Sequence, residues 1–245
     1  MRKQYWYVII TYVIMQLSSI AGVPLLLYFG VGEAESKETA ISIASGYWAV
    51  ISFTLAFFLV LYFMRADMKP SYDRERASVP SAILWSIGGF FLALFAQGIA
   101  ANIELRLFGI EMGSENTRRI VEIVKLTPSL ILVTSIIGPI LEELIFRKII
   151  FGTLYKKYNF VIAATVSSLL FAVVHMELEH LLLYSTMGFV FAFLYVKTKR
   201  IMVPIFAHVM MNTFVIMIQT FFADQIEEII RQSEQMQWIF WGLMK

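Results

Sequence analysis

Long apolar stretches separated by short polar connections run through most of this chain. A membrane-spanning helix needs about 20 mostly apolar residues. Windows of this kind can be placed at residues 5–29, 41–64, 82–101, 128–155, 159–175, 180–196 and 203–222. The pattern predicts an all-α, polytopic transmembrane helical bundle of about seven spans, with six or eight as alternatives. Short connections in the second half predict antiparallel neighbours that pack against each other.

Two segments differ from this pattern. Residues 102–127 mix charged side chains with Ile, Leu and Val, and we expect an amphipathic interfacial helix over 114–125. The end of the chain is acidic at first and then carries Trp238, Phe240 and Trp241. Aromatic residues are enriched at membrane–water interfaces, so this tail is predicted to be interfacial.

The chain shows no internal repeat and no low-complexity linker, so we treat it as one integrated membrane domain. Within it we distinguish three parts: N-terminal helices with an amphipathic connector (1–127), a helical core that holds the candidate chemistry (128–222), and the interfacial tail (223–245).

Composition supports a membrane location. Of the 245 residues, 59% are hydrophobic and 16% charged, which is too apolar for an average soluble domain. The net charge of +2 is small, and the basic residues are spread between apolar stretches, so nucleic acid is not an expected partner. The absence of cysteine excludes disulfides, a thiol nucleophile and a thiolate metal site.

The amino terminus resembles a signal peptide only superficially. Arg2 and Lys3 precede an apolar stretch that is longer than the roughly 7 to 15 residues of a signal h-region, so we predict a retained first span. An integral protein of the cell membrane with a cytoplasmic amino terminus is expected, because that orientation places most basic residues inside. These residues are Arg2, Lys3, Arg65, Lys69, Arg74, Arg76, Lys148, Lys156, Lys157, Lys197, Lys199 and Arg200.

A pair of carboxylates interrupts the fourth apolar stretch. An acid within a membrane helix is costly and is by default a candidate for function. Glu143 and Arg147 are four residues apart, in the favourable order for an ion pair, and are predicted to support the site. Glu142 points elsewhere and lacks such a local partner, so it is the candidate for chemistry. In the alternative interpretation, both acids lie near a helix end and are solvated by a loop.

The three histidines differ in context. His175 follows Phe171 by four residues at the end of the fifth stretch, and His208 precedes Asn212 by four within the seventh. Each pair should share a helical face. Taken singly, each histidine is also compatible with a hydrogen-bonded core residue. His180, close to two glutamates in a short connection, is predicted to lie on the surface.

The ordered motifs Glu142-Glu143-x-x-x-Arg147, Phe171-x-x-x-His175 and His208-x-x-x-Asn212 resemble the CAAX protease and bacteriocin-processing enzyme family, also called the Abi family, which includes the type II CAAX prenyl endopeptidases. The resemblance covers residues 127–222. All three motifs are complete, although each alone is weak.

The resemblance implies a membrane-embedded endopeptidase that acts without a metal or other cofactor. Glu142 would be the general base, and His175 would help to hold the attacking water. His208 and Asn212 would form the oxyanion hole, and Phe171 is a candidate contact for the substrate. The implied partners are the lipid bilayer and a peptide or membrane-protein precursor, such as a bacteriocin or signalling peptide of a bacterium.

Other functions remain open from the sequence. Carboxylates and imidazoles are ordinary zinc ligands, although the His-Glu-x-x-His helix is absent. The family resemblance also extends to non-catalytic membrane scaffolds and bacteriocin-immunity proteins. A small proton-coupled transporter would also use intramembrane Glu and His, but the two halves show no repeated pair of interrupted helices.

Overall fold

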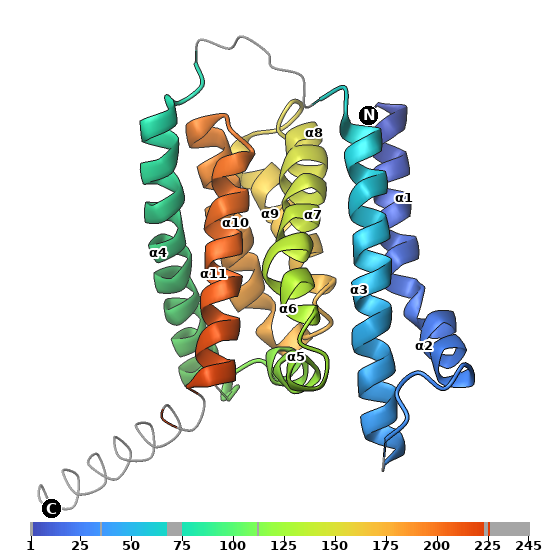
Figure 1. Ribbon diagram of the computed structural model, residues 1–245. Helices are drawn as coiled ribbons and strands as arrows, with labels where there is room; N and C mark the ends of the chain where they lie inside the picture. Colours follow the sequence, from blue (N-terminus) through green and yellow to red (C-terminus); the bar gives the residue numbers. More distant parts are fainter. Residues whose placement is uncertain (1, 35, 68–74, 112, 223–224, 226–245) are drawn as a thin grey trace, which may run out of the picture.

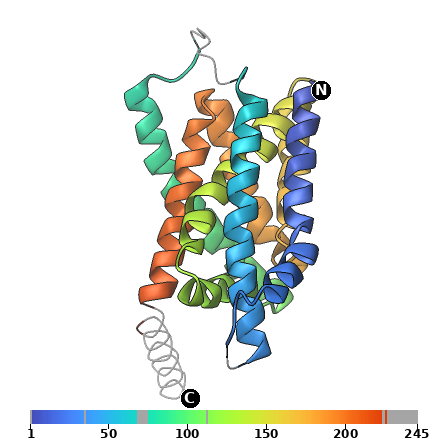
Figure 2. The ribbon, with the colours of Figure 1, turned by 45° about the vertical axis from the view of Figure 1, so that its right-hand side comes forward.

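The computed structural model describes residues 2–34, 36–67, 75–111, 113–222 and 225. All regular elements in this part of the chain are helical, and the long helices run side by side (Figures 1 and 2). Large apolar side chains such as Leu55, Phe58 and Phe95 are exposed on the outside of the bundle. An apolar exterior is suited to lipid, and the prediction of an all-α membrane bundle is confirmed.

Helices make up the regular structure of the described residues. In chain order they are α1 (Lys3–Leu17), α2 (Ser19–Tyr28), α3 (Lys37–Met64), α4 (Val79–Ile103), α5 (Glu115–Leu126), α6 (Leu130–Leu132), α7 (Gly138–Glu142), α8 (Gly152–Leu154), α9 (Phe160–Val173), α10 (Leu181–Thr198) and α11 (Met202–Phe221). Hydroxyl and amide side chains cap several N-termini, as where Ser36 accepts a hydrogen bond from the Thr39 backbone N–H at the start of α3.

The first predicted span is not one straight helix. It is divided into α1 and α2, which are bent by 45° at Ser18. The Ser18 hydroxyl accepts a hydrogen bond from Trp48 Nε1 at 2.9 Å, and Pro24 inside α2 has no N–H to donate. A Cβ atom on Gly22 would lie 1.8 Å from the Trp48 ring, so only glycine lets α2 approach α3 this closely.

Four helices of the described chain are long and apolar enough to cross a membrane, or five if the bent pair α1 and α2 is one span. They are α3, α4 continued by the π-helical segment η1 (Glu104–Phe108), α10 preceded by the 3₁₀ turn η4 (Leu178–His180), and α11. Helix α9 is apolar but shorter. The count of about seven spans therefore stays a prediction.

The fourth predicted span is a helix with changing pitch. Between α6 and α8 the backbone widens into π-helical segments η2 (Val133–Ile137) and η3 (Glu143–Phe151), with α7 between them. Glu142 is the last residue of α7 and Glu143 the first of η3. Segments of π-helix are frequent at functional sites because they change which side chains face a neighbour.

The predicted amphipathic helix is confirmed as α5. Ser114 caps it by accepting a hydrogen bond from the Thr117 backbone N–H at 2.9 Å. Helix α5 lies across one end of the bundle (Figure 1, bottom). The aromatic tail that we predict to be interfacial falls outside the described residues.

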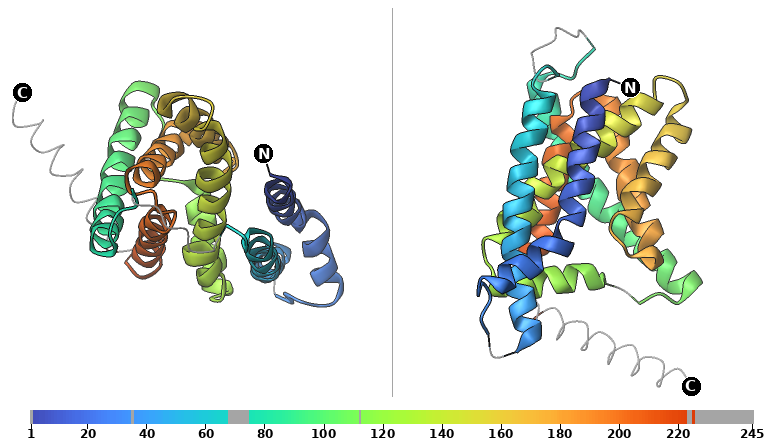
Figure 3. Two further views of the ribbon diagram at one scale, coloured as in Figure 1. Left: turned by 90° about the horizontal axis from the view of Figure 1, so that it is seen from above. Right: turned by 90° about the vertical axis from the view of Figure 1, so that its right-hand side faces the viewer.

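The long helices form two layers. In one layer, α10 packs against α9 and α4, and α11 also packs against α4; in the other layer, α1 and α2 pack mainly on α3 (Figure 3, left). Helices α9 and α10 approach closely at Gly188, where a Cβ would lie 2.6 Å from Ser168 Cβ. Small residues at such crossings are typical of membrane helix pairs. The core between the layers contains the fourth predicted span.

Candidate active site

A row of charged side chains crosses the centre of the bundle. Arg147 Nη1 lies 3.1 Å from Glu143 Oε1, and the same oxygen is 2.9 Å from His208 Nδ1. Glu142 Oε2 lies 3.7 Å from His208 Nε2. One imidazole therefore connects the two carboxylates, which approach it from opposite ring nitrogens. This arrangement joins the α7–η3 segment to α11.

Aromatic rings enclose the inner part of this row. The Arg147 guanidinium carbon lies 4.2 Å from the centre of the Phe171 ring and 5.2 Å from that of Phe191. The His208 ring stacks on Phe191 with centroids 4.6 Å apart. A cation between aromatic faces is stabilised by their quadrupoles, most strongly where water is excluded. Arg147 is only 1% exposed, so Glu143 and these rings, and not water, stabilise its charge.

His175 is fixed from two sides. Its Nδ1 lies 2.7 Å from the Phe171 carbonyl oxygen, one helical turn earlier. Its ring stacks on Tyr184 of α10, with centroids 4.1 Å apart. Because a carbonyl can only accept, Nδ1 carries the proton, and Nε2 is free to accept a hydrogen bond. His175 is half-buried and lies at the edge of a cavity.

Asn212 lies one turn after His208 on α11. Its Nδ2 donates to the Thr134 carbonyl oxygen at 3.2 Å. Thr134 belongs to the π-helical segment η2. The amide keeps its second N–H for another acceptor.

One cavity of about 730 Å³ brings these groups together. Its lining includes Glu142, His175, His208 and Asn212, which come from α7, the turn after α9, and α11. The Glu142 side chain is 17% exposed and is thus accessible to water within the site. Four of the seven motif residues therefore share one cavity, whereas Glu143, Arg147 and Phe171 do not line it.

The cavity is also lined by polar residues that the sequence analysis missed. Tyr12 and Gln16 of α1 and Gln97 of α4 line it, although the sequence analysis places the candidate chemistry within residues 128–222. Gln16 Nε2 donates to the Tyr12 hydroxyl at 3.1 Å. The spacing of four between these two polar residues in an apolar helix was an available signal.

Phe171 does not lie where it could contact a substrate in the cavity. It is fully buried and is absent from the residues that line the cavity. Its ring packs on Arg147 and on the rings of His175 and His208. Being apolar and large, it fills the space behind the site and fixes the polar side chains.

The prediction that His180 lies on the surface is wrong. It is 4% exposed, and its Nδ1 lies 2.8 Å from Glu104 Oε2. The other oxygen of Glu104 accepts the Leu183 backbone N–H at 2.9 Å. This buried pair ties the end of α4 to the start of α10. Sequence distance hides it, because Glu104 is 76 positions before His180.

Glu177 joins α5 to the turn that carries His175. Its Oε1 accepts the Asn116 backbone N–H at 2.6 Å, and its Oε2 accepts from the hydroxyls of Ser114 and Tyr184, both at 2.7 Å. Desolvation alone would raise the pKa of the Glu177 carboxyl, but these hydrogen bonds outweigh it and lower the pKa below its usual value. We call this set of contacts the Glu177 clasp.

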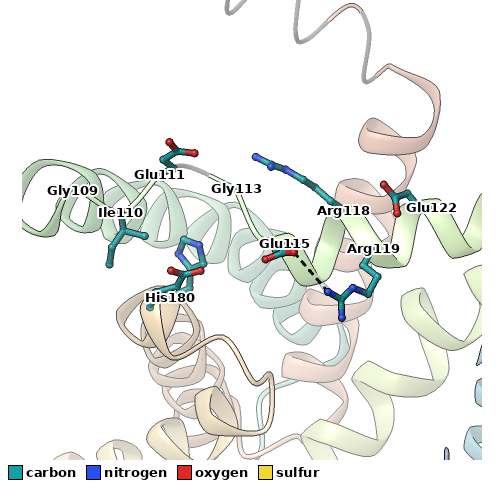
Figure 4. A pocket seen from close by; sticks show the side chains of 10 residues that line it. Gly109, Ile110, Glu111, Gly113, Glu115, Arg118, Arg119, Glu122 and His180 are labelled. Carbon is teal, nitrogen blue, oxygen red and sulfur yellow. Dashed lines mark ion pairs between the residues drawn. The ribbon is translucent and has the colours of Figure 1, made fainter. Parts of the chain in front are cut away.

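A second pocket of about 690 Å³ lies beside α5 (Figure 4). Exposed charged residues line it, among them Glu111, Arg118 and Glu122, and an ion pair joins Glu115 to Arg119 at 3.7 Å. It shares Gly113 with the cavity described above. None of the motif residues lines it, so the chemistry belongs to the larger cavity.

The carboxylates and imidazoles of the site are residue types that also bind metal ions. Within the described part of the chain, no group of three or more His, Cys, Asp or Glu side chains is arranged to hold a metal ion. Zinc sites need at least three such protein ligands around one point. Metal independence stays a prediction.

The chain is similar to known proteins over nearly its whole length. Residues 125–214 match the family model described as type II CAAX prenyl endopeptidase Rce1-like. The "Putative membrane peptidase YdiL" of Bacillus subtilis is 51% identical over 245 residues, covering 99% of each chain. The "Membrane-embedded CAAX protease MroQ" of Staphylococcus aureus is 30% identical over 243 residues, covering 96% of this chain and 98% of the relative. No solved structure matches.

The helical membrane bundle and these relatives define a membrane-embedded peptidase. The chain belongs to the Rce1-like CAAX protease family.

Proposed function

We propose that this peptidase cleaves peptide or membrane-protein precursors with a water molecule activated by Glu142 and His175, and that His208 and Asn212 bind the oxyanion. The observation that supports this is the shared cavity of about 730 Å³, lined by these four side chains. Their donor and acceptor properties fit the four roles.

The acceptors suit a water molecule. Glu142 would accept a hydrogen bond from the water and then, as the general base, take that proton. His175 Nε2 would accept a hydrogen bond from the other hydrogen of the water. The His175 tautomer follows from its contact with the Phe171 carbonyl. The water oxygen would attack the peptide carbonyl, and Glu142 would return the proton to the leaving amine. Every atom and proton of hydrolysis is then accounted for without a covalent enzyme intermediate.

The donors suit an oxyanion. Asn212 has one N–H beyond the one that Thr134 accepts. His208 donates through Nδ1 to Glu143, so its Nε2 donates to an oxyanion only when the ring carries both protons. Removing one such donor from an enzyme costs about 100-fold to 1,000-fold in kcat.

The substrate is proposed as a peptide precursor or the tail of a membrane protein in a bacterial cell membrane, for example a bacteriocin or a secreted signalling peptide. Support comes from two bacterial relatives of nearly equal length, one of which is named as a CAAX protease. The amino terminus is proposed to lie in the cytoplasm, because most basic residues then lie inside.

The test of the base is Glu142→Gln, which preserves shape and removes basicity. Cleavage should fall by about 100-fold to 10,000-fold, as for loss of a general base. Peptides from membranes with the native enzyme would be compared with those from the variant, at equal amounts of protein in the membrane. The matched control is Glu122→Gln, at an exposed carboxylate of α5, which should cleave like the native enzyme. Identical peptides from native and Glu142→Gln membranes would instead support a non-catalytic scaffold or immunity protein.

The metal prediction has its own test. The purified protein should cleave the peptides found above equally well before and after dialysis against a strong chelator, since Glu142 and His175 alone activate the water. Elemental analysis of the same sample should find no stoichiometric zinc. Cleavage that is lost with chelator and returns with added zinc would overturn the metal-free mechanism.

A further inference from the structure

The two ends of the helical bundle differ in charge. One end, here called the basic end, holds the start of α1 and the connections α3–α4, α8–α9 and α10–α11 (Figure 1, top). The basic residues described there are Arg2, Lys3, Arg65, Arg76, Lys148, Lys156, Lys157, Lys197, Lys199 and Arg200. Its described acids, Asp67 and Glu75, form ion pairs with Arg2 and Lys199.

The opposite end, here called the acidic end, holds α2, the start of α3, α5 and the α9–α10 connection (Figure 1, bottom). Its described basic residues are fewer: Lys37, Arg106, Arg118, Arg119 and Lys125. Its described carboxylates are Glu33, Glu38, Glu104, Glu111, Glu115, Glu122, Glu177 and Glu179. Lys and Arg are enriched in cytoplasmic connections, so this difference favours a cytoplasmic basic end.

The cavity lies toward the acidic end. Helices α1 and α4 start at the basic end and line it only with late residues, Tyr12 and Gln16 in α1 and positions 94–101 in α4. Helix α10 starts at the acidic end and lines the cavity with early residues, from Leu183 to Met187. Helix α5, wholly at the acidic end, supplies Asn116, Thr117, Ile120 and Ile123. No residue named at the basic end lines the cavity.

Packed side chains close the site toward the basic end. Along η3, the residues that follow Glu142 and Glu143 in that direction include Ile145 and Ile149, both buried. Along α10, Phe191 and Leu194 follow Met187 and are fully buried. The pocket at the basic end, lined by Asp67, Arg76 and Lys148 among others, contains none of the motif residues. Among the described residues, packed side chains thus separate the cavity from the pocket at the basic end.

The opposite side of the cavity is accessible. Met176, directly after His175, lines it and is 84% exposed. The adjoining pocket of Figure 4 shares Gly113 with the cavity and is lined by exposed charges such as Glu111 and Arg118. Exposed charges belong in water or at the interface rather than in hydrocarbon. The mouth of the cavity thus lies at the membrane surface of the acidic end.

We propose that the catalytic cavity opens on the extracytoplasmic side of the membrane. Its substrates are then peptide bonds at or just within the outer surface, in exported peptides or in the outer segments of membrane-anchored proteins, and not cytoplasmic protein tails. The choice of substrate rests on the proposed function, whereas the direction of the opening does not. The charge distribution and the position of the cavity together support the direction of the opening.

The chain contains no cysteine, so single-cysteine variants report on one position each. Met176→Cys marks the mouth, Glu122→Cys marks exposed α5, and Lys156→Cys marks the exposed α8–α9 connection. Cells of a Gram-positive host would be treated with a membrane-impermeant maleimide before and after permeabilisation. The two acidic-end variants should be labelled in intact cells, and Lys156→Cys only after permeabilisation. The reverse pattern would overturn the proposal.

Two acidic-end variants are used so that misfolding of one leaves the other to decide, and labelling does not depend on catalysis. The substrate part is tested with the peptides that differ between native and Glu142→Gln membranes. Their cleaved bonds should map to extracytoplasmic segments of the parent proteins. Bonds on the cytoplasmic side would overturn the substrate class. Absence of any difference would refute the proposed function and leave the labelling result to decide the direction of the opening.

Discussion

The Arg147 guanidinium lies among the most deeply buried groups of the molecule, between the Phe171 and Phe191 rings. Its carboxylate partner Glu143 also holds His208 through Nδ1. Two buried charges attract strongly in a poor dielectric, but each lost its hydration on folding. Glu143 consequently has two tasks, to neutralise Arg147 and to orient His208.

Breaking this pair by Glu143→Gln should lower the free energy of unfolding by about 3 to 5 kcal/mol, because it leaves a buried charge uncompensated. The double variant Glu143→Gln/Arg147→Met removes both charges and should recover part of that loss. Thermal unfolding of the detergent-solubilised proteins measures both effects. Additive losses in the double variant would show that the two side chains are not coupled.

Local spacing made part of this network predictable. The Glu143–Arg147 pair follows from a separation of four on a helix and is confirmed at 3.1 Å. The contact of Glu143 with His208 joins positions 65 apart and depends on how α11 packs against the fourth predicted span. The burial of His180 was missed for the same reason, because its partner Glu104 belongs to a distant helix.

Among the elements, α5 has the most direct relation to the site. It lines the cavity, and the Glu177 clasp fixes its N-terminal end to the turn that carries His175. Tyr184 donates to Glu177 and stacks on His175, so the same contacts also hold the imidazole in place. The clasp therefore connects the position of a surface helix to the geometry of the site.

This clasp should make stability depend on pH. The pKa of Glu177 is lowered in the folded protein, so the clasp contributes fully above the ordinary carboxyl value of 4.5 and is lost as the pH falls below it. Solvent screening keeps the contribution to about 1 kcal/mol, which corresponds to about 2–4 °C in Tm for a chain of this size. Glu177→Gln should lower Tm by this amount near neutral pH, and the difference should disappear under acid conditions.

The control for this measurement is Glu179→Gln, two positions further on, at an exposed carboxylate. Its Tm should follow that of the native protein at every pH. If Glu177→Gln and Glu179→Gln behave alike across the titration, the clasp contributes nothing specific and the pH dependence has another origin.

Element boundaries were predicted where the sequence has its own signals. The amphipathic pattern over 114–125 corresponds to α5, whose cap is Ser114. The division of the first span at Ser18 was not predicted, because it depends on a hydrogen bond from Trp48 of α3. The π-helical segments around α7 were also not foreseen, since no residue pattern distinguishes them from an α-helix before the neighbours are known.

At the scale of the whole molecule, the first helices are more than a membrane anchor. Tyr12, Gln16 and Gln97 complete a cavity whose motif residues all lie in the second half of the chain. The family model covers residues 125–214, whereas the two relatives match over nearly the whole chain. Residues from both halves of the chain therefore line the site.

The sequence by itself determined the all-α membrane class, the three motifs and the family to which they point, because hydropathy and spacing on a helix are local properties. Only the tertiary structure decided that Glu142, His175, His208 and Asn212 line one cavity, that Phe171 lies behind it, and that it lies toward the acidic end. These features depend on contacts between helices far apart in the chain. Such contacts are fixed by side-chain packing and by the pairing of buried charges.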